Sequence, residues 1–158
     1  MIKHKMLKPY MNAARGFALL SHAKRKKVGY VAITPQDIMI YSWNGRPSGD
    51  DNNCEITVPI FNTMNGVKVE VGCDIVTHPE CLHAERNIIA KAAREGISLK
   101  GANLVGTLSP CLECALQLHQ AGVESVIYEE EYRLTDGIEY LRRKGIHCEQ
   151  YQEETCEL

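Results

Sequence analysis

The sequence predicts one α/β domain built around a mixed β-sheet, and three observations lead to this fold class. The first is length, because 158 residues suffice for one ordinary domain with a sizeable core. The second is composition: 44% hydrophobic and 24% charged residues are typical of globular proteins. The third is the order of patterns, in which a pair of strands is followed by alternating helices and strands. No internal repeat or linker divides the chain, so we expect a single domain over residues 1–158.

The first elements are expected to be a helix and a two-stranded hairpin. Apolar residues recur at helical spacing over 9–20, which predicts a helix. Strands are predicted at 28–33 and 38–43, because both are apolar and rich in β-branched or aromatic residues, and 34–37 between them has turn residues. A basic run at 24–27 precedes the first strand and is either a solvated loop or a local phosphate-binding segment.

The segment 44–81 carries few regular patterns. It is rich in Gly, Asn, Asp and Pro, and its only apolar stretches are short, at 58–61 and 67–71. Irregular segments of this length are uncommon in compact domains and are usually functional. We therefore expect a long functional loop here.

The second half of the chain alternates helices with strands. Helical periodicity returns at 83–95, and a strand is predicted at 102–108. Pro110 suits the first turn of a further helix, which Gly122 ends. The remaining patterns predict a strand at 123–128, a helix at 135–144 and a strand at 146–148. Together with the hairpin, this makes five strands.

Two short motifs carry the chemistry: His83-Ala84-Glu85 and Pro110-Cys111-Leu112-Glu113-Cys114. One imidazole nitrogen and two thiolates fill three corners of a zinc tetrahedron and leave the fourth open for water, which indicates catalysis. Each motif opens a predicted helix, where the helix dipole favours thiolates. We predict that His83, Cys111 and Cys114 are the zinc ligands and that Glu85 transfers protons.

A structural zinc site is the alternative interpretation of these residues. It needs a fourth ligand, for which Cys81, Cys54, Cys73 and His78 are candidates. We favour the catalytic site, because His-x-Glu followed by Pro-Cys-x-x-Cys is the signature of zinc-dependent nucleobase deaminases.

On these motifs the chain resembles the cytidine deaminase superfamily, and within it the deoxycytidylate deaminases. The resemblance extends over Val28-Gly29, over Trp43-Asn44-Gly45-Arg46-Pro47-Ser48-Gly49-Asp50-Asp51, over His83-Ala84-Glu85-Arg86-Asn87, and over Thr107-Leu108-Ser109-Pro110-Cys111. The second string is similar to the family's Gly-Tyr-Asn-Gly-x-Pro-x-Gly loop, with Ser42 and Trp43 in place of Gly-Tyr. The resemblance implies a three-layer α/β/α cytidine deaminase-like fold with a central mixed five-stranded sheet.

The resemblance also implies a function, which is the zinc-dependent hydrolytic deamination of dCMP to dUMP and ammonia, feeding dTTP synthesis. It implies one catalytic Zn²⁺ per chain, activation by dCTP with Mg²⁺, inhibition by dTTP, and a homohexamer. Two alternatives stay open. One is another zinc deaminase, acting on cytidine, guanine or tRNA adenosine; the other is a nonenzymatic zinc module in which Glu85 is incidental.

Substrate and effector residues are assigned by the same resemblance. Asn44 is expected to contact the deoxyribose or base, unless it is simply a turn residue. The other expected substrate-binding residues are Ser21, Lys24, Arg25, Tyr132 and Arg133, which could hold the 5′-phosphate, together with Thr107 and Ser109. The expected effector residues are Gly45, Arg46, Asp50, Asp51, Asn87 and Arg94, although Arg94 could equally be a solvated helix residue.

Some relatives carry a second, structural zinc, for which Cys54, Cys73, His78 and Cys81 are candidates. The segment before Val28 has Ala23 and no cysteine, so one expected ligand is missing, and we favour small buried side chains instead.

Charge and cysteine usage bear on partners and location. The net charge of -2 argues against stable nucleic-acid binding. No apolar run approaches the ~18 residues of a membrane span, and the start lacks an apolar signal core. Seven cysteines, an odd number, suit a reducing compartment. We therefore expect the cytoplasm of a cell, or of a host cell for a phage protein.

Overall fold

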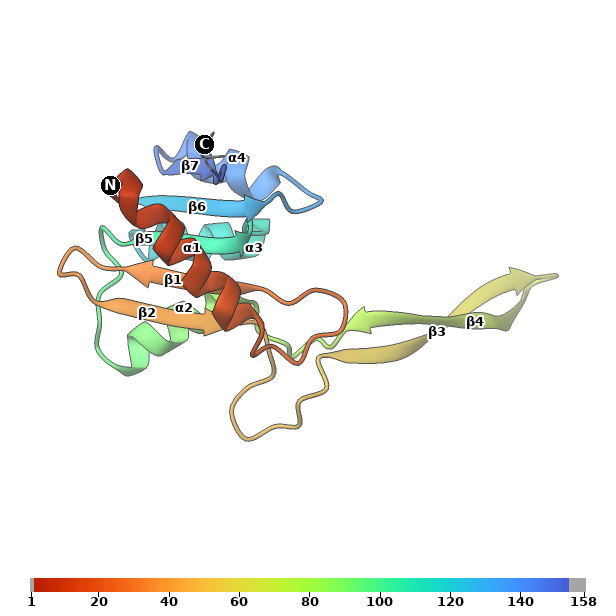
Figure 1. Ribbon diagram of the computed structural model, residues 1–158. Helices are drawn as coiled ribbons and strands as arrows, with labels where there is room; N and C mark the ends of the chain where they lie inside the picture. Colours follow the sequence, from red (N-terminus) through yellow and green to blue (C-terminus); the bar gives the residue numbers. More distant parts are fainter. Residues whose placement is uncertain (1, 154–158) are drawn as a thin grey trace, which may run out of the picture.

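The computed structural model describes residues 2–153, and its centre is a five-stranded sheet (Figure 1). The strands lie in the order β2 (Met39–Trp43), β1 (Gly29–Ile33), β5 (Asn103–Leu108), β6 (Ser125–Glu130), β7 (His147–Gln150). β1 runs antiparallel to both β2 and β5, whereas β5, β6 and β7 are parallel to one another. The sheet is therefore mixed, as predicted.

Four helices cover the two faces of the sheet. They are α1 (His4–Ala18), α2 (Ala84–Arg94), α3 (Leu112–Gln120) and α4 (Asp136–Arg143). On one face Met11 of α1 packs with the buried Val31, Val105 and Ile127. On the other face, side chains of α2, α3 and α4 share one core with β1, β5 and β6. This arrangement confirms the predicted three layers.

The helix α1 begins at His4, five residues before the predicted start. Leu7 and Tyr10 pack against the sheet together with Met11, so the first turns also bury apolar surface. Pro9 lies inside the helix. Since proline usually marks a first turn, the prediction began the helix there.

The prediction of a long irregular loop at 44–81 is wrong over residues 55–77. β3 (Glu55–Met64) and β4 (Val67–Thr77) form an antiparallel hairpin that projects from the body of the domain, and we call it the arm (Figure 1). Asn65 and Gly66 connect the strands with φ of 51° and 78°, as in a type I′ turn. Most side chains of the arm are exposed, so burial imposes no apolar alternation on its sequence.

The ends of the predicted domain, Met1 and residues 154–158, lie outside the described residues. Within residues 2–153, no helix combines the length and the apolar character needed to cross a membrane.

Candidate active site

The three predicted zinc ligands meet where two helices begin. His83 and Cys111 are the residues immediately before α2 and α3, and both have extended backbone there. Cys114 lies in the first turn of α3 and is fully buried. His83 Nδ1 lies 3.5 Å from Cys111 Sγ and 3.4 Å from Cys114 Sγ.

This geometry fits a zinc ion. The three ligand atoms all lie within 4.8 Å of one another. In a tetrahedron with Zn–S of about 2.3 Å and Zn–N of about 2.0 Å, nitrogen and sulfur are about 3.5 Å apart. Among the residues from 2 to 153, no other group of three His, Cys, Asp or Glu side chains is placed to hold a metal.

The Cys111 and Cys114 thiols shift each other's pKa in opposite directions. A hydrogen bond from Cys114 lowers the pKa of the Cys111 thiol to about 3, and the same bond is the main cause that raises the pKa of Cys114. The hydrogen bond with Cys111 also raises the pKa of His83. The start of α3 therefore favours the thiolate form of Cys111, and a divalent cation would favour ionisation of both thiols.

Glu85 lies in the first turn of α2 and is only 4% exposed. Burial raises the pKa of its carboxyl group to about 7, while His83 and Cys114 act in the opposite direction. A carboxyl group with a pKa near neutrality can both take up and release a proton at pH 7. Glu85 therefore has the properties of a general acid and base.

His83, Glu85 and Cys111 line a pocket of about 280 Å³. Five of the eight residues expected to bind substrate also line it: Arg25, Asn44, Ser109, Tyr132 and Arg133. The pocket wall includes further residues that the sequence analysis did not single out for the site, among them Lys26, Glu55 and Thr77. Lys26 belongs to the recognised basic run, whereas Glu55 and Thr77 come from the base of the arm, where no local pattern marks them.

The other three expected substrate residues do not line the described pocket. Two of them, Ser21 and Thr107, make hydrogen bonds to backbone groups near it. Ser21 Oγ donates to the Asn44 carbonyl at 2.8 Å. Thr107 Oγ1 accepts a bond from the Gly29 amide at 3.1 Å. The third, Lys24, has an exposed side chain.

Asn44 connects the pocket wall to the basic run. Its Oδ1 accepts from the Val28 amide at 2.8 Å, and its Nδ2 donates to the Lys26 carbonyl at 2.9 Å. Both ends of this amide are therefore bonded to the backbone that precedes β1.

Residues 4–130 match the family model described as the cytidine and deoxycytidylate deaminase zinc-binding region. The chain belongs to this family. The deoxycytidylate deaminase of Schizosaccharomyces pombe is 28% identical over 143 residues, which are 90% of this chain and 42% of the relative. The deoxycytidylate deaminase of Enterobacteria phage T4 is 31% identical over 134 residues, which are 67% of this chain and 68% of the relative.

Solved structures show the same family likeness. The dCMP deaminase from the cyanophage S-TIM5, in complex with dCMP and dUMP, is 35% identical with a TM-score of 0.78. That match covers 96% of this chain and 100% of the cyanophage chain. By contrast, the chain spans less than half the length of the S. pombe relative.

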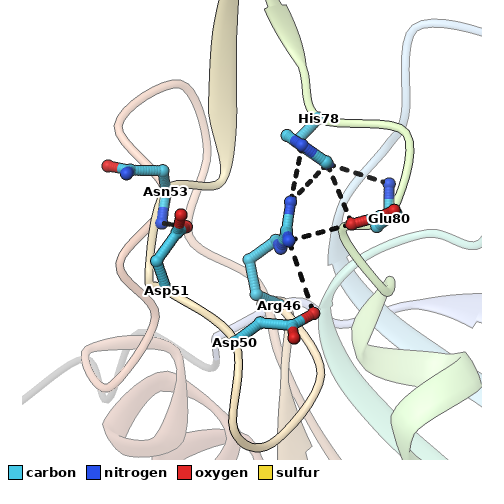
Figure 2. Close-up of polar contacts among 6 residues, drawn as sticks. All are labelled: Arg46, Asp50, Asp51, Asn53, His78 and Glu80. Carbon is cyan, nitrogen blue, oxygen red and sulfur yellow. Dashed lines mark hydrogen bonds and ion pairs between the residues drawn. The ribbon is translucent and has the colours of Figure 1, made fainter.

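Two of the expected effector residues, Arg46 and Asp50, lie together beside the base of the arm (Figure 2). Arg46 Nη2 lies 2.8 Å from a carboxylate oxygen of Glu80 and 3.3 Å from one of Asp50. Its Nη1 lies 2.6 Å from His78 Nε2. Figure 2 shows the side chains of Asp50, His78 and Glu80 converging on the guanidinium group of Arg46. We call these four residues the Arg46 cluster.

The remaining expected effector residues have other contacts. Asp51 accepts a bond of 2.9 Å from the Asn53 amide, which is the main cause lowering its pKa. Asn87 Nδ2 donates to the Trp43 carbonyl at 2.8 Å. Arg94 pairs with Glu95 at the exposed end of α2. Gly45 bonds to Leu82 through its backbone.

The four candidates for a second zinc do not converge within the described residues. Cys54 and Cys81 are buried together against Ala23, where burial raises the pKa of the Cys81 thiol to about 12. Cys73 is exposed on β4, and His78 faces Arg46.

Proposed function

We propose that this chain is a zinc-dependent deaminase that converts dCMP and water to dUMP and ammonia. The observation that carries the proposal is the group of His83, Cys111 and Cys114 with the buried Glu85 beside it, at a pocket that also has cationic walls. The names of the S. pombe and phage relatives support the choice of substrate.

His83, Cys111 and Cys114 would hold a zinc ion, which would supply a Lewis acid able to activate water at neutral pH. Glu85 takes a proton from the attacking water and delivers it to the ring nitrogen next to the reacting carbon. It then takes the remaining proton of the added hydroxyl and gives it to the departing amine, so that ammonia leaves and the carbonyl of uracil remains.

The 5′-phosphate is assigned to the pocket wall that carries Arg25, Lys26 and Arg133. A dianion needs donors of this kind, and arginine offers paired N–H groups for two oxygens. Tyr132 lies on the same wall and adds a hydroxyl donor.

Regulation and assembly are a further part of the proposal. We infer activation by dCTP with Mg²⁺, inhibition by dTTP and a homohexamer, with the product feeding dTTP synthesis in the cytoplasm. These follow from the family resemblance. The Arg46 cluster supports them by offering a cation next to Asp50 on the expected effector loop.

A panel assay tests the substrate. Ammonia release is measured for dCMP, deoxycytidine, CMP and guanine, with Glu85→Gln as the inactive control. We expect dCMP to give the highest kcat/KM. Preference for a base or nucleoside without phosphate would select another deaminase, and no release from any substrate would favour the nonenzymatic zinc module.

A further inference from the structure

Glu55 joins the base of the arm to the basic run in the pocket wall. It is the first residue of β3, and one of its carboxylate oxygens, Oε1, accepts two backbone hydrogen bonds. The donors are the amides of Lys24 at 2.8 Å and of Arg25 at 3.1 Å. Two consecutive N–H groups that converge on one anionic oxygen form a favourable anion-binding arrangement.

The position of Glu55 is itself well defined. It pairs with Thr77 of β4, and its neighbour Cys54 is buried. The Cys54 carbonyl accepts a bond of 2.8 Å from the His78 amide, which closes the base of the arm. The carboxylate therefore extends from a hydrogen-bonded anchor toward a segment that has neither helix nor strand.

The basic run at 24–27 lies within a segment, 22–27, that has neither helix nor strand. Its position therefore depends on hydrogen bonds to neighbouring side chains. Asn44 holds its C-terminal end through Val28 and Lys26. Ser21 Oγ accepts from the Ala23 amide at its N-terminal end. Glu55 holds the middle, at Lys24 and Arg25, from which the Arg25 side chain reaches the pocket wall.

We propose that Glu55 is a positioning residue that holds Arg25 and the basic run in place for the 5′-phosphate of the substrate. This inference rests on the proposed function. Glu55 acts through the backbone of the run, because a carboxylate would repel a phosphate dianion at direct contact. Its loss should therefore weaken the binding of phosphate-bearing ligands and leave the chemistry at Glu85 unchanged.

Steady-state kinetics of Glu55→Ala test this role with dCMP and with deoxycytidine, which lacks the phosphate. Loss of two charge-assisted hydrogen bonds is expected to raise KM for dCMP about tenfold or more, with kcat within about twofold of the wild type. The kcat/KM for deoxycytidine should stay unchanged. Direct titration with dUMP should show the same loss of affinity.

Two further variants separate positioning from other effects. Glu55→Gln keeps an oxygen that can accept both amide bonds, so it should restore most of the affinity for dCMP. Glu70→Ala removes an exposed carboxylate elsewhere on the arm and should behave as the wild type.

The proposal is overturned if Glu55→Ala binds dCMP and dUMP like the wild type, or if it loses deoxycytidine activity to the same degree. A Glu55→Gln variant as impaired as the alanine variant would also overturn it. If Glu55→Ala does not fold, Glu55→Gln and Glu55→Asp test the proposal instead. The shorter Asp side chain should raise KM for dCMP, whereas Gln should leave it near the wild-type value. A wild-type protein inactive on dCMP would instead refute the proposed function.

Discussion

Gly45 and Leu82 lie opposite each other and exchange two backbone hydrogen bonds, with N–O distances of 3.0 and 2.8 Å. Gly45 follows the pocket residue Asn44, and Leu82 precedes the zinc ligand His83. This bridge therefore holds the segment of Asn44 beside the segment of His83 in the pocket wall, although the arm separates the two in sequence.

A proline at position 45 should disrupt this bridge, because it removes the N–H group that bonds to Leu82. We expect Gly45→Pro to lower stability by about 1–3 kcal/mol and to raise KM for dCMP. Gly45→Ala is the matched control, because a Cβ there has no neighbour nearer than 3.9 Å and the N–H group remains. Chemical denaturation and kinetics of both variants measure the difference, and equal behaviour would show that the bridge is dispensable.

A second prediction concerns the packing of α4 against the zinc motif. A Cβ on Gly137 would lie 2.2 Å from the Pro110 carbonyl oxygen and 2.8 Å from the Cys111 carbonyl carbon. Gly137→Ala must therefore displace the start of α3, and we expect a loss of about 1–3 kcal/mol together with reduced zinc content.

Gly16→Ala is the control for this substitution. Gly16 lies inside α1, and a Cβ there meets nothing within 4 Å. Alanine should increase stability by about 0.5–1 kcal/mol, because glycine is a poor helix former. A Gly137→Ala protein with full stability and full zinc content would contradict the predicted clash.

Removal of zinc should destabilise the fold, because an ion held by His83, Cys111 and Cys114 would connect the starts of α2 and α3. At a free zinc concentration a thousandfold above Kd, binding contributes about 4 kcal/mol, so a chelator should lower Tm on the order of 10 °C. Cys114→Ser should show this lower Tm without chelator. Cys73→Ser, at an exposed position on the arm, should retain the wild-type response.

The raised pKa of Glu85 predicts how the stability of the fold depends on pH. Its pKa of about 7 in the fold is raised from an ordinary value of 4.5, so the folded protein binds more protons than the unfolded chain between these values. The stability that this group contributes is fully present below pH 4.5 and is lost as pH rises to about 7. Relative to Glu85→Gln, the chelated wild type should lose about 3 kcal/mol over this range.

Denaturation of both chelated proteins at several pH values measures that difference, and a constant difference would show that Glu85 titrates normally. With zinc restored, Glu85→Gln should bind the metal like the wild type. Its kcat should fall by about 10²–10⁴-fold, because the proton carrier is lost.

The zinc site could be predicted from sequence because it consists of two short motifs, each with a defined internal spacing, although the motifs are 28 to 31 residues apart. His83 and Glu85 are two residues apart, Cys111 and Cys114 are three apart, and each pair stands at the start of a helix. The inner strands of the sheet were predictable from local patterns as well, since β1 and β5 are buried along almost their whole length and are mostly apolar.

The opposite wall of the pocket could not be predicted in this way. Glu55 reaches the basic run through contacts that span about thirty residues, and no local spacing encodes such a pair. The arm was missed because its exposed strands lack a buried face, although Asn65-Gly66 between β-branched stretches is a hairpin signal.

The shape of the arm has a practical consequence. Only its base contributes to the pocket, through Glu55 and Thr77, whereas the Asn65-Gly66 turn lies at the far end of two long strands (Figure 1). A fluorophore or a short peptide tag inserted at this turn would stand well apart from the zinc motif. The tip of the arm is thus an attachment point that lies outside the pocket within one chain.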